Sequence, residues 1–297
     1  MIDFKPITPK EHNLFKKYYS FKADNAENSF ANLCAYSFLY KGEYALLEDT
    51  LLTRIHFEYN KQICYYMPMG KMPLKDVVNL LIQDSKEQNY QLNFVVEDET
   101  PFKEFFPDMF HATTMRDAYD YLYLRIDLAN LSGKKYQSKR NHINKFCNLY
   151  SYKFKTLTAS DKEECMQMLE RWRKQEMNIS PSFKRDYDDE YNVINYLFDN
   201  FNDLEMFGGA IMVENLMVAF SLGSAVNERT FDTNIEKADR DYMGSYALIN
   251  REMAIHLPDN FQFINREEDK GIFGLRKAKL SYHPYKMIVK TILTFDS

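Results

Sequence analysis

The sequence has 297 residues and a formal net charge of −5, which disfavours a general nucleic-acid-binding protein. Its 45% hydrophobic and 27% charged residues, with nine Gly and nine Pro, indicate a globular protein without low-complexity segments. No stretch approaches the length of a membrane span, the first residues lack a signal-peptide pattern, and Cys34, Cys64, Cys147 and Cys165 form no CxxC pair. We therefore expect a cytoplasmic protein with reduced thiols, no transmembrane segment and no metal site.

The first half is predicted to alternate helices and strands. Thr8, Pro9 and Glu11 form an N-cap, a first-turn proline and a capping partner, which predicts a helix over about residues 9–20. Two more helices are expected, over about 28–39 and from Pro73 to about 88. Runs rich in β-branched and aromatic residues predict strands over 44–49, 51–59, 62–68, 92–98 and 117–128.

The second half repeats this order of elements. Helices are expected over about 134–148, 160–177, 183–200, 244–256 and 274–280. Strands are expected over 152–158, 208–226 (two strands joined at Glu214 and Asn215), 230–238, 261–265 and 286–295. The pattern predicts an α/β (α+β) protein with domains 1–128 and 129–297, the second built on a single mixed sheet. The similar halves hint at a duplication, although no repeat is visible residue by residue.

Three segments carry a recognisable family pattern: LSGKKYQSKRNHINKF (131–146), IEKADRDYMGSYALIN (235–250) and NREEDKGIFGLRKAKLSYHP (265–284). Together they resemble a bacterial family of uncharacterised proteins similar to the C-terminal domain of phosphatidylglycerol lysyltransferase. That family is similar to tandem GNAT-type folds and to the Fem-type peptidyltransferases, which add amino acids to peptidoglycan precursors from aminoacyl-tRNA. The resemblance implies two tandem acyl-CoA N-acyltransferase-like domains, each a mixed, mostly antiparallel sheet flanked by helices. It also implies transfer of an acyl or aminoacyl group, with the active site in the second domain.

The loop after the strand at 230–238 is expected to bind the donor. In acetyltransferases of the resembled fold, this loop cradles the coenzyme A pyrophosphate with backbone amides in the pattern R/Q-x-x-G-x-G/A. Here Arg240, Tyr242 and Gly244 stand in a stretch with one late glycine and an aspartate, which favours aminoacyl-tRNA over acetyl-CoA. The alternative is a simple turn before a helix. Glu236 and Lys237, just before the loop, are donor-binding candidates or a buried ion pair.

Two segments of this acidic protein are basic and free of acid. Residues 131–145 carry five Lys or Arg, and residues 270–295 carry six. Cations on a helix can neutralise phosphates of a nucleotide, a tRNA end or a lipid head group. The first segment supplies the donor-binding candidates Lys135, Lys139, Arg140, Asn141 and Asn144. The alternative is a solvated basic face.

Five polar residues follow the apolar run FQFI, where a strand gives way to a loop. Asn265 and Arg266 are candidates for substrate binding. Glu267, Glu268 and Asp269 are candidates for recognising an α-ammonium group or for deprotonating the acceptor. The alternative is a solvated acidic turn.

Further along, Arg276 and Lys279 are candidates for stabilising the oxyanion of a tetrahedral intermediate, or for binding phosphate. Tyr282 is a candidate proton donor, and a structural role for at least one of these residues is also expected.

The leading hypothesis is therefore an aminoacyltransferase that uses aminoacyl-tRNA and a lipid head-group or cell-wall peptide acceptor, without a tightly bound cofactor. An acyl-CoA-dependent acetyltransferase is the second hypothesis. A binding module without catalysis and a peripheral membrane protein remain open as further interpretations.

Overall fold

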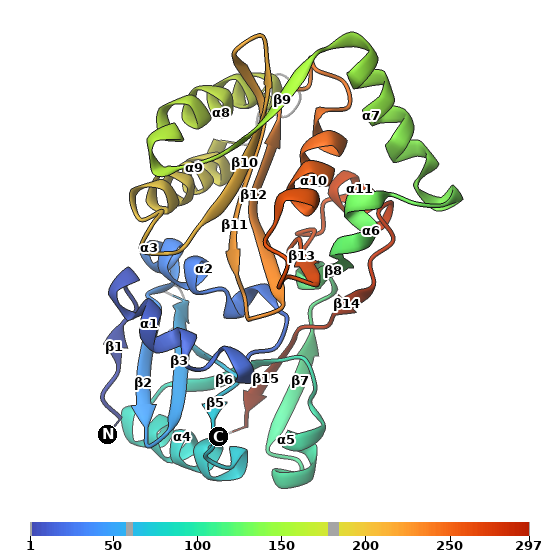
Figure 1. The fold of residues 1–297 in the computed structure, drawn as a ribbon. Helices are drawn as coiled ribbons and strands as arrows, with labels where there is room; N and C mark the ends of the chain where they lie inside the picture. Colours follow the sequence, from blue (N-terminus) through green and yellow to red (C-terminus); the bar gives the residue numbers. More distant parts are fainter. Residues whose placement is uncertain (1, 58–61, 178–183, 297) are drawn as a thin grey trace.

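The computed structural model describes residues 2–57, 62–177 and 184–296, which form two mixed sheets stacked end to end (Figure 1). The first sheet has the order β1-β2-β3-β4-β6-β15-β7, and β5 pairs with β3. All its pairs are antiparallel except β4 with β6. Its strands are β1 (Lys5–Pro6), β2 (Glu43–Leu47), β3 (Thr50–Phe57), β4 (Gln62–Tyr66), β5 (Met69–Gly70), β6 (Gln91–Val96), β7 (Phe110–Thr114) and β15 (Thr291–Phe295).

The second sheet has the order β14-β8-β13-β12-β11-β10-β9 and repeats this plan. Only β12 and β13 pair in parallel, over three residues each. Its strands are β8 (Asp120–Leu124), β9 (Tyr152–Thr156), β10 (Phe207–Val213), β11 (Leu216–Ala225), β12 (Thr230–Ala238), β13 (Phe263–Asn265) and β14 (Lys286–Ile288). The expected tandem acyltransferase-like architecture, with mostly antiparallel sheets and flanking helices, is therefore confirmed.

Helices cover the sheets and bury their apolar faces. In the first half these are α1 (His12–Lys16), α2 (Phe30–Ala35), α3 (Ser37–Tyr40), α4 (Leu74–Gln88) and α5 (Thr100–Phe105). In the second half they are α6 (Arg125–Asn130), α7 (Gln137–Leu149), α8 (Lys162–Met177), α9 (Lys184–Asp199), α10 (Ser245–His256) and α11 (Phe273–Leu280). Helices α7 and α10 share one hydrophobic core with the second sheet, and α8 and α9 share another with α2 of the first half.

Each sheet takes one strand from the other half of the chain. Strand β15 lies between β6 and β7, and β8 lies between β13 and β14. The chain therefore passes between the sheets twice, after β7 and after β14. The domain boundary expected near residue 129 stays a prediction. Strand β8 precedes this boundary but lies in the second sheet, and β15 follows it but lies in the first sheet.

Two expected strands are corrected by the structure. The strand predicted over 117–128 ends at Leu124, because α6 begins at Arg125, whose guanidinium donates to the carbonyls of Ala254 and Pro258. The strand predicted over 286–295 is two strands in different sheets, with the buried Lys290 between them. The helix expected over 9–20 is a short α1 between two 3-10 turns, and its predicted capping box between Thr8 and Glu11 is confirmed. In the described ranges, no helix is long and apolar enough to cross a bilayer.

Candidate functional site

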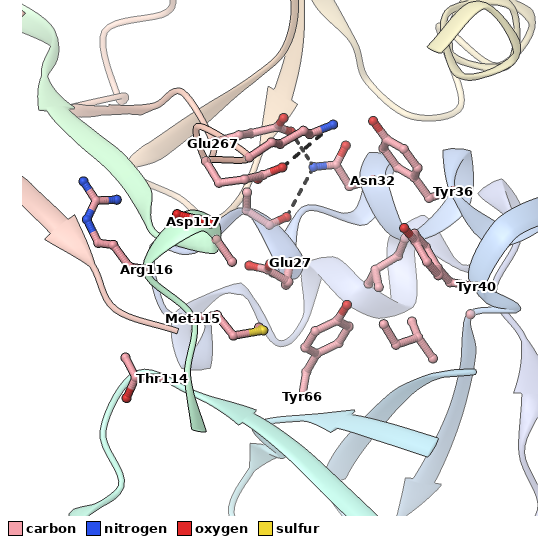
Figure 2. Close-up of a pocket in the computed structure, with 17 residues that line it drawn as sticks. Glu27, Asn32, Tyr36, Tyr40, Tyr66, Thr114, Met115, Arg116, Asp117 and Glu267 are labelled. Atoms are coloured by element: carbon pink, nitrogen blue, oxygen red, sulfur yellow. Dashed lines mark hydrogen bonds and ion pairs between the residues drawn. The ribbon is translucent and has the colours of Figure 1, made fainter. Parts of the chain in front are cut away.

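A cavity of about 730 Å³ opens where the two sheets meet (Figure 2). The first half contributes residues of α2, α3 and the crossing after β7, and the second half contributes the loop after β13. The cavity is lined by Ala26, Glu27, Asn32, Leu33, Tyr36, Tyr40, Gly42, Ile55, Tyr66, Thr114, Met115, Arg116, Asp117, Ala118, Glu267, Glu268 and Lys270. Two of the predicted catalytic residues, Glu267 and Glu268, are thus brought to the junction of the halves.

Carboxylates from both halves form one wall of this cavity. Glu267 has a left-handed backbone (φ 54°), and its Oε1 accepts a hydrogen bond of 2.9 Å from Asn32 Nδ2. Burial, and to a lesser degree the neighbouring Glu268, raises the pKa of Glu267 to about 8. Burial also raises the pKa of Glu27 to about 7, although Lys290 opposes that shift. At neutral pH both carboxyl groups are therefore partly protonated, and a cationic ligand in the cavity would favour their charged form.

Behind this wall lies a buried polar layer. Asn32 Nδ2 also donates to Asp232 Oδ2 at 3.0 Å, and burial raises the pKa of Asp232 well above its usual value. Lys290 Nζ lies 2.6 Å from both Glu27 Oε1 and Asp120 Oδ1. The side chain of Lys290 is 2% exposed and that of Asp120 is fully buried. This layer fixes the orientation of Glu27 and Asn32 toward the cavity.

Another part of the lining is aromatic and apolar, as Figure 2 shows for Tyr36, Tyr40, Tyr66 and Met115. Burial raises the pKa values of Tyr36 and Tyr66 well above their usual value, so both phenols stay neutral at physiological pH. The cavity thus pairs an acidic wall with a wall suited to an uncharged chain or ring.

Asp269 points away from the cavity and anchors the loop that carries Glu267 and Glu268. Its carboxylate accepts from Arg276 Nη2 (2.7 Å), Tyr121 Oη (2.6 Å) and the amide of Gly271 (2.9 Å). The Arg276 hydrogen bonds hold the pKa of Asp269 well below its usual range. Arg276 also pairs with Asp117 on the cavity rim at 2.6 Å. In this structure, Asp269 and Arg276 hold the loop in place. Arg276 thus has the structural role expected for at least one residue of its group, whereas Asp269 is buried and is not part of a solvated acidic turn.

Lys279 and Asn265 also hold the loop that carries Glu267 and Glu268, through hydrogen bonds to its backbone. Lys279 Nζ donates to the carbonyls of Arg266, Glu267 and Glu268, and burial lowers its pKa to about 8. Asn265 donates to Asp120 Oδ2 at 3.0 Å and accepts from the amide of Glu267 at 2.7 Å. Both side chains therefore set the backbone position of the cavity carboxylates.

A second cluster of polar side chains, which we call the second polar group, lies on the side of the second sheet that α10 covers. Arg266 Nη2 pairs with Glu236 Oε1 at 2.7 Å, and its guanidinium carbon lies 5.0 Å from the centre of the Tyr282 ring. Lys139 Nζ lies 3.8 Å from the same ring centre, and burial lowers its pKa to about 8. Burial also raises the pKa of Tyr282 above its usual value. Four predicted residues that are far apart in the sequence therefore meet here: Lys139, Glu236, Arg266 and Tyr282.

The other predicted donor-binding residues do not appear in the cavity lining of the described chain. Lys135 pairs with Asp127 at 3.5 Å, Arg140 donates to the carbonyl of Gly133 at 2.7 Å, Asn141 accepts from Gln137 at 3.1 Å, and Asn144 is exposed. Lys237 faces α9, where it pairs with Glu190 at 2.8 Å, and Arg240 pairs with Glu176. The Tyr242 ring lies 5.0 Å from that of Tyr150.

In the loop before α10, backbone amides donate hydrogen bonds to Asp239 of the same loop. Asp239 Oδ1 accepts from the amide of Asp241 at 3.0 Å, and the Asp239 carbonyl accepts from the amide of Tyr242 at 3.2 Å. Gly244 has φ 100°, and a Cβ there would lie 2.4 Å from the carbonyl oxygen of His142. These amides bind within the loop, so this loop differs from an open pyrophosphate cradle.

Sequence reasoning missed residues of both halves at the site. From the first half these are Glu27, Asn32, Tyr36, Tyr66 and Asp120, and from the second half Asp232 and Lys290. The sequence did carry one signal of the buried polar layer. Lys290 interrupts the apolar run MIVKTIL, and a charged side chain buried among apolar residues requires a partner of opposite charge. Among the described residues, no three His, Cys, Asp or Glu side chains are grouped to hold a metal ion.

The family model described as "Phosphatidylglycerol lysyltransferase, C-terminal" matches residues 19–292. A protein of unknown function from Bacteroides thetaiotaomicron is 36% identical, with a TM-score of 0.94 over 100% of both chains. The chain is also 28% identical over 177 residues to an uncharacterised protein of Mycoplasmoides gallisepticum, a match that covers 59% of this chain and 55% of that protein.

More distant structures share the fold alone. The C-terminal domain of a lysylphosphatidylglycerol synthetase from Agrobacterium fabrum, itself described as putative, has a TM-score of 0.67 at 12% identity, covering 98% of this chain and 93% of its own. FemX has a TM-score of 0.62 at 8% identity, covering 100% and 98%. A tandem GNAT protein from the clavulanic acid biosynthesis pathway has a TM-score of 0.51 at 7% identity, covering 100% and 99%.

Proposed function

This chain belongs to the family of the phosphatidylglycerol lysyltransferase C-terminal domain, and from that membership we propose that it transfers an aminoacyl group from aminoacyl-tRNA. The acceptor in this proposal is an amine or hydroxyl group of a lipid head group or a cell-wall peptide. Because aminoacyl-tRNA is a cytoplasmic substrate, the reaction would take place in the cytoplasm.

The observation that carries the proposal is the carboxylate wall of the cavity, formed by Glu27, Glu267 and Glu268. An aminoacyl ester carries an α-ammonium group beside its reacting carbonyl, whereas an acetyl thioester carries no charge there. A buried acidic wall would bind the ammonium group and would offer little to an acetyl group. The loop at Asp239 also argues against a bound pyrophosphate, because the Asp241 amide already donates a hydrogen bond to Asp239.

The chemistry assigns different roles to the two neighbouring glutamates. The acceptor oxygen or nitrogen attacks the ester carbonyl, the bond to the ribose oxygen of tRNA breaks, and the acceptor proton ends on that oxygen. Glu267 is proposed to take the acceptor proton, because its raised pKa makes its carboxylate a stronger base. Glu268 and Glu27 are proposed to hold the ammonium group.

The second polar group is the proposed contact for the donor's phosphates. Lys139 and Arg266 bring two cations to one aromatic ring, and the exposed Lys145 lies on the same helix as Lys139. In this proposal Tyr282 positions both cations. Asp269, Arg276 and Lys279 support the loop, and the oxyanion role predicted for the two basic residues becomes a secondary hypothesis.

The test is transfer of radiolabel from a pool of aminoacyl-tRNAs to a bacterial lipid and cell-wall precursor extract, with labelled acetyl-CoA in a parallel reaction. We expect label to move from tRNA and not from acetyl-CoA. Glu267→Gln should lower the rate of transfer by about 10²–10⁴-fold, whereas the exposed control Glu104→Gln should retain it. Transfer from acetyl-CoA alone would replace the proposal with an acetyltransferase. Ligand binding without turnover from either donor would indicate a binding module.

A further inference from the structure

The segment from Lys270 to Lys286 presents an exposed apolar surface that the proposed reaction does not use. Phe273 is 80% exposed and Ile272 is 55% exposed, and both are flanked by Gly271 and Gly274. A Cβ at Gly274 would have no atom within 4 Å, so this turn stands clear of the rest of the protein. Large apolar side chains at this exposure are costly in water unless a partner covers them.

Helix α11 continues the same surface. Phe273, Lys277 and Leu280 follow helical spacing along one stripe, and Leu280 is 44% exposed. Tyr285, just beyond the helix, is 61% exposed. We call Ile272, Phe273, Lys277, Leu280 and Tyr285 the α11 surface.

The segment that carries this surface is basic, although the exposed carboxylate of Asp117 pairs with its Arg276. Residues 270–286 contain five Lys or Arg and no Asp or Glu. Arg276 and Lys279 are engaged by Asp269 and by backbone carbonyls, whereas Lys277 is exposed on the outer stripe. An exposed helix with apolar and basic residues on one surface is suited to the interface of an anionic bilayer.

The α11 surface also adjoins the cavity. Arg276 in the first turn of the helix pairs with Asp117, and Lys270, two residues before Ile272, lines the cavity. A flat surface bound by Ile272 and Phe273 would therefore lie next to the cavity rim.

We propose that the α11 surface docks this protein on anionic phospholipid bilayers, with Ile272 and Phe273 inserted among the acyl chains and Lys277 at the head groups. A bilayer fits better than RNA, because the aliphatic Ile272 and Leu280 offer no stacking to bases but gain from burial in hydrocarbon. It fits better than a protein partner, because lysine is depleted in protein interfaces and enriched at anionic membranes. This inference goes beyond the proposed transfer, which leaves the acceptor open between lipid and peptide.

The test is co-sedimentation of the full chain with vesicles of phosphatidylcholine containing one third phosphatidylglycerol, and with vesicles of phosphatidylcholine alone. The wild type should bind the anionic vesicles and dissociate as salt is raised. The double variant I272S/F273S should lower the partition coefficient by about tenfold or more, since two exposed side chains lose their burial in lipid. Lys277→Gln should weaken binding to anionic vesicles only. The control variant Leu46→Ser changes an exposed apolar residue on β2 of the first sheet, and it should bind anionic vesicles like the wild type.

The proposal would be overturned if I272S/F273S and the wild type bound vesicles equally. It would also be overturned if the wild type did not bind anionic vesicles. Two further results would also overturn it: tRNA binding that depends on Ile272 and Phe273 without vesicle binding, or a dimer that the double variant dissociates. Because the assay contains no donor, its result is separate from the proposed transfer. Vesicle binding without any transfer would leave docking standing and remove the transferase proposal.

Discussion

Lys290 Nζ lies 2.6 Å from Glu27 Oε1, although the two residues are 263 positions apart in the chain. The contact joins the point where the chain returns from the second sheet to the first with a residue that lines the cavity. Asp120 Oδ1 lies 2.6 Å from the same ammonium group, at the point where the chain first crosses to the second sheet. One buried lysine thus ties both crossings of the chain to the acidic wall.

Replacing Lys290 with methionine should therefore destabilise the whole protein. The change leaves Glu27 and Asp120 buried without their cation, and breaking a buried pair typically costs about 3–5 kcal/mol. The free energy of unfolding from urea denaturation should fall by roughly that amount. Lys286→Met is the matched control, because Lys286 is 55% exposed and lies 3.7 Å from Glu97. Equal stability of the two variants would contradict the structural role of Lys290.

The raised pKa of Glu267 makes stability depend on pH in a defined direction. The folded state holds this proton up to about pH 8, whereas an unfolded glutamate loses it near pH 4.5. Between these values the folded state binds more protons, so its stability falls as pH rises and levels off above pH 8. Glu267→Gln removes this dependence, so the variant should match the wild type near pH 5. At pH 9 the variant should be more stable by on the order of 4 kcal/mol, since about three pH units each contribute about 1.4 kcal/mol.

Denaturation of both proteins at several pH values measures this difference directly. Glu104→Gln, an exposed change on α5, should follow the wild type throughout. A constant difference between Glu267→Gln and the wild type from pH 5 to pH 9 would show that Glu267 does not titrate in this range.

The same pKa predicts the pH profile of the proposed transfer. If the Glu267 carboxylate is the base, kcat/KM should rise with pH and reach a plateau above about pH 8. Glu267→Gln should lower kcat by about 10²–10⁴-fold and remove the rising limb. Steady-state kinetics at a series of pH values measures both effects. A rising limb that persists in Glu267→Gln would assign it to another group.

The sequence predicted local features of the fold better than its long-range contacts. Thr8 and Glu11 predicted a capping box because both partners lie within one turn. By contrast, residues 286–295 form one continuous β-rich run in the sequence, and only the tertiary structure shows that it is two strands in different sheets on either side of Lys290. In the same way Glu267 and Glu268 were predicted from their position after a strand. Asn32 could not be predicted, since its contact with Glu267 spans 235 positions.

Gly244 offers the sharpest test of whether the loop before α10 is a structural turn or a donor cradle. Its backbone is left-handed, and an added Cβ would meet the carbonyl oxygen of His142 at 2.4 Å, a backbone atom that cannot rotate away. Gly244→Ala should therefore destabilise the protein by about 1–3 kcal/mol, with the loss visible in thermal denaturation. Gly274→Ala is the matched control, because no atom lies within 4 Å of its added Cβ and the site is in the first turns of α11. There the same change should be neutral or stabilising by up to about 1 kcal/mol, since alanine favours helix. A Gly244→Ala variant with normal stability but weakened donor binding would instead favour the cradle.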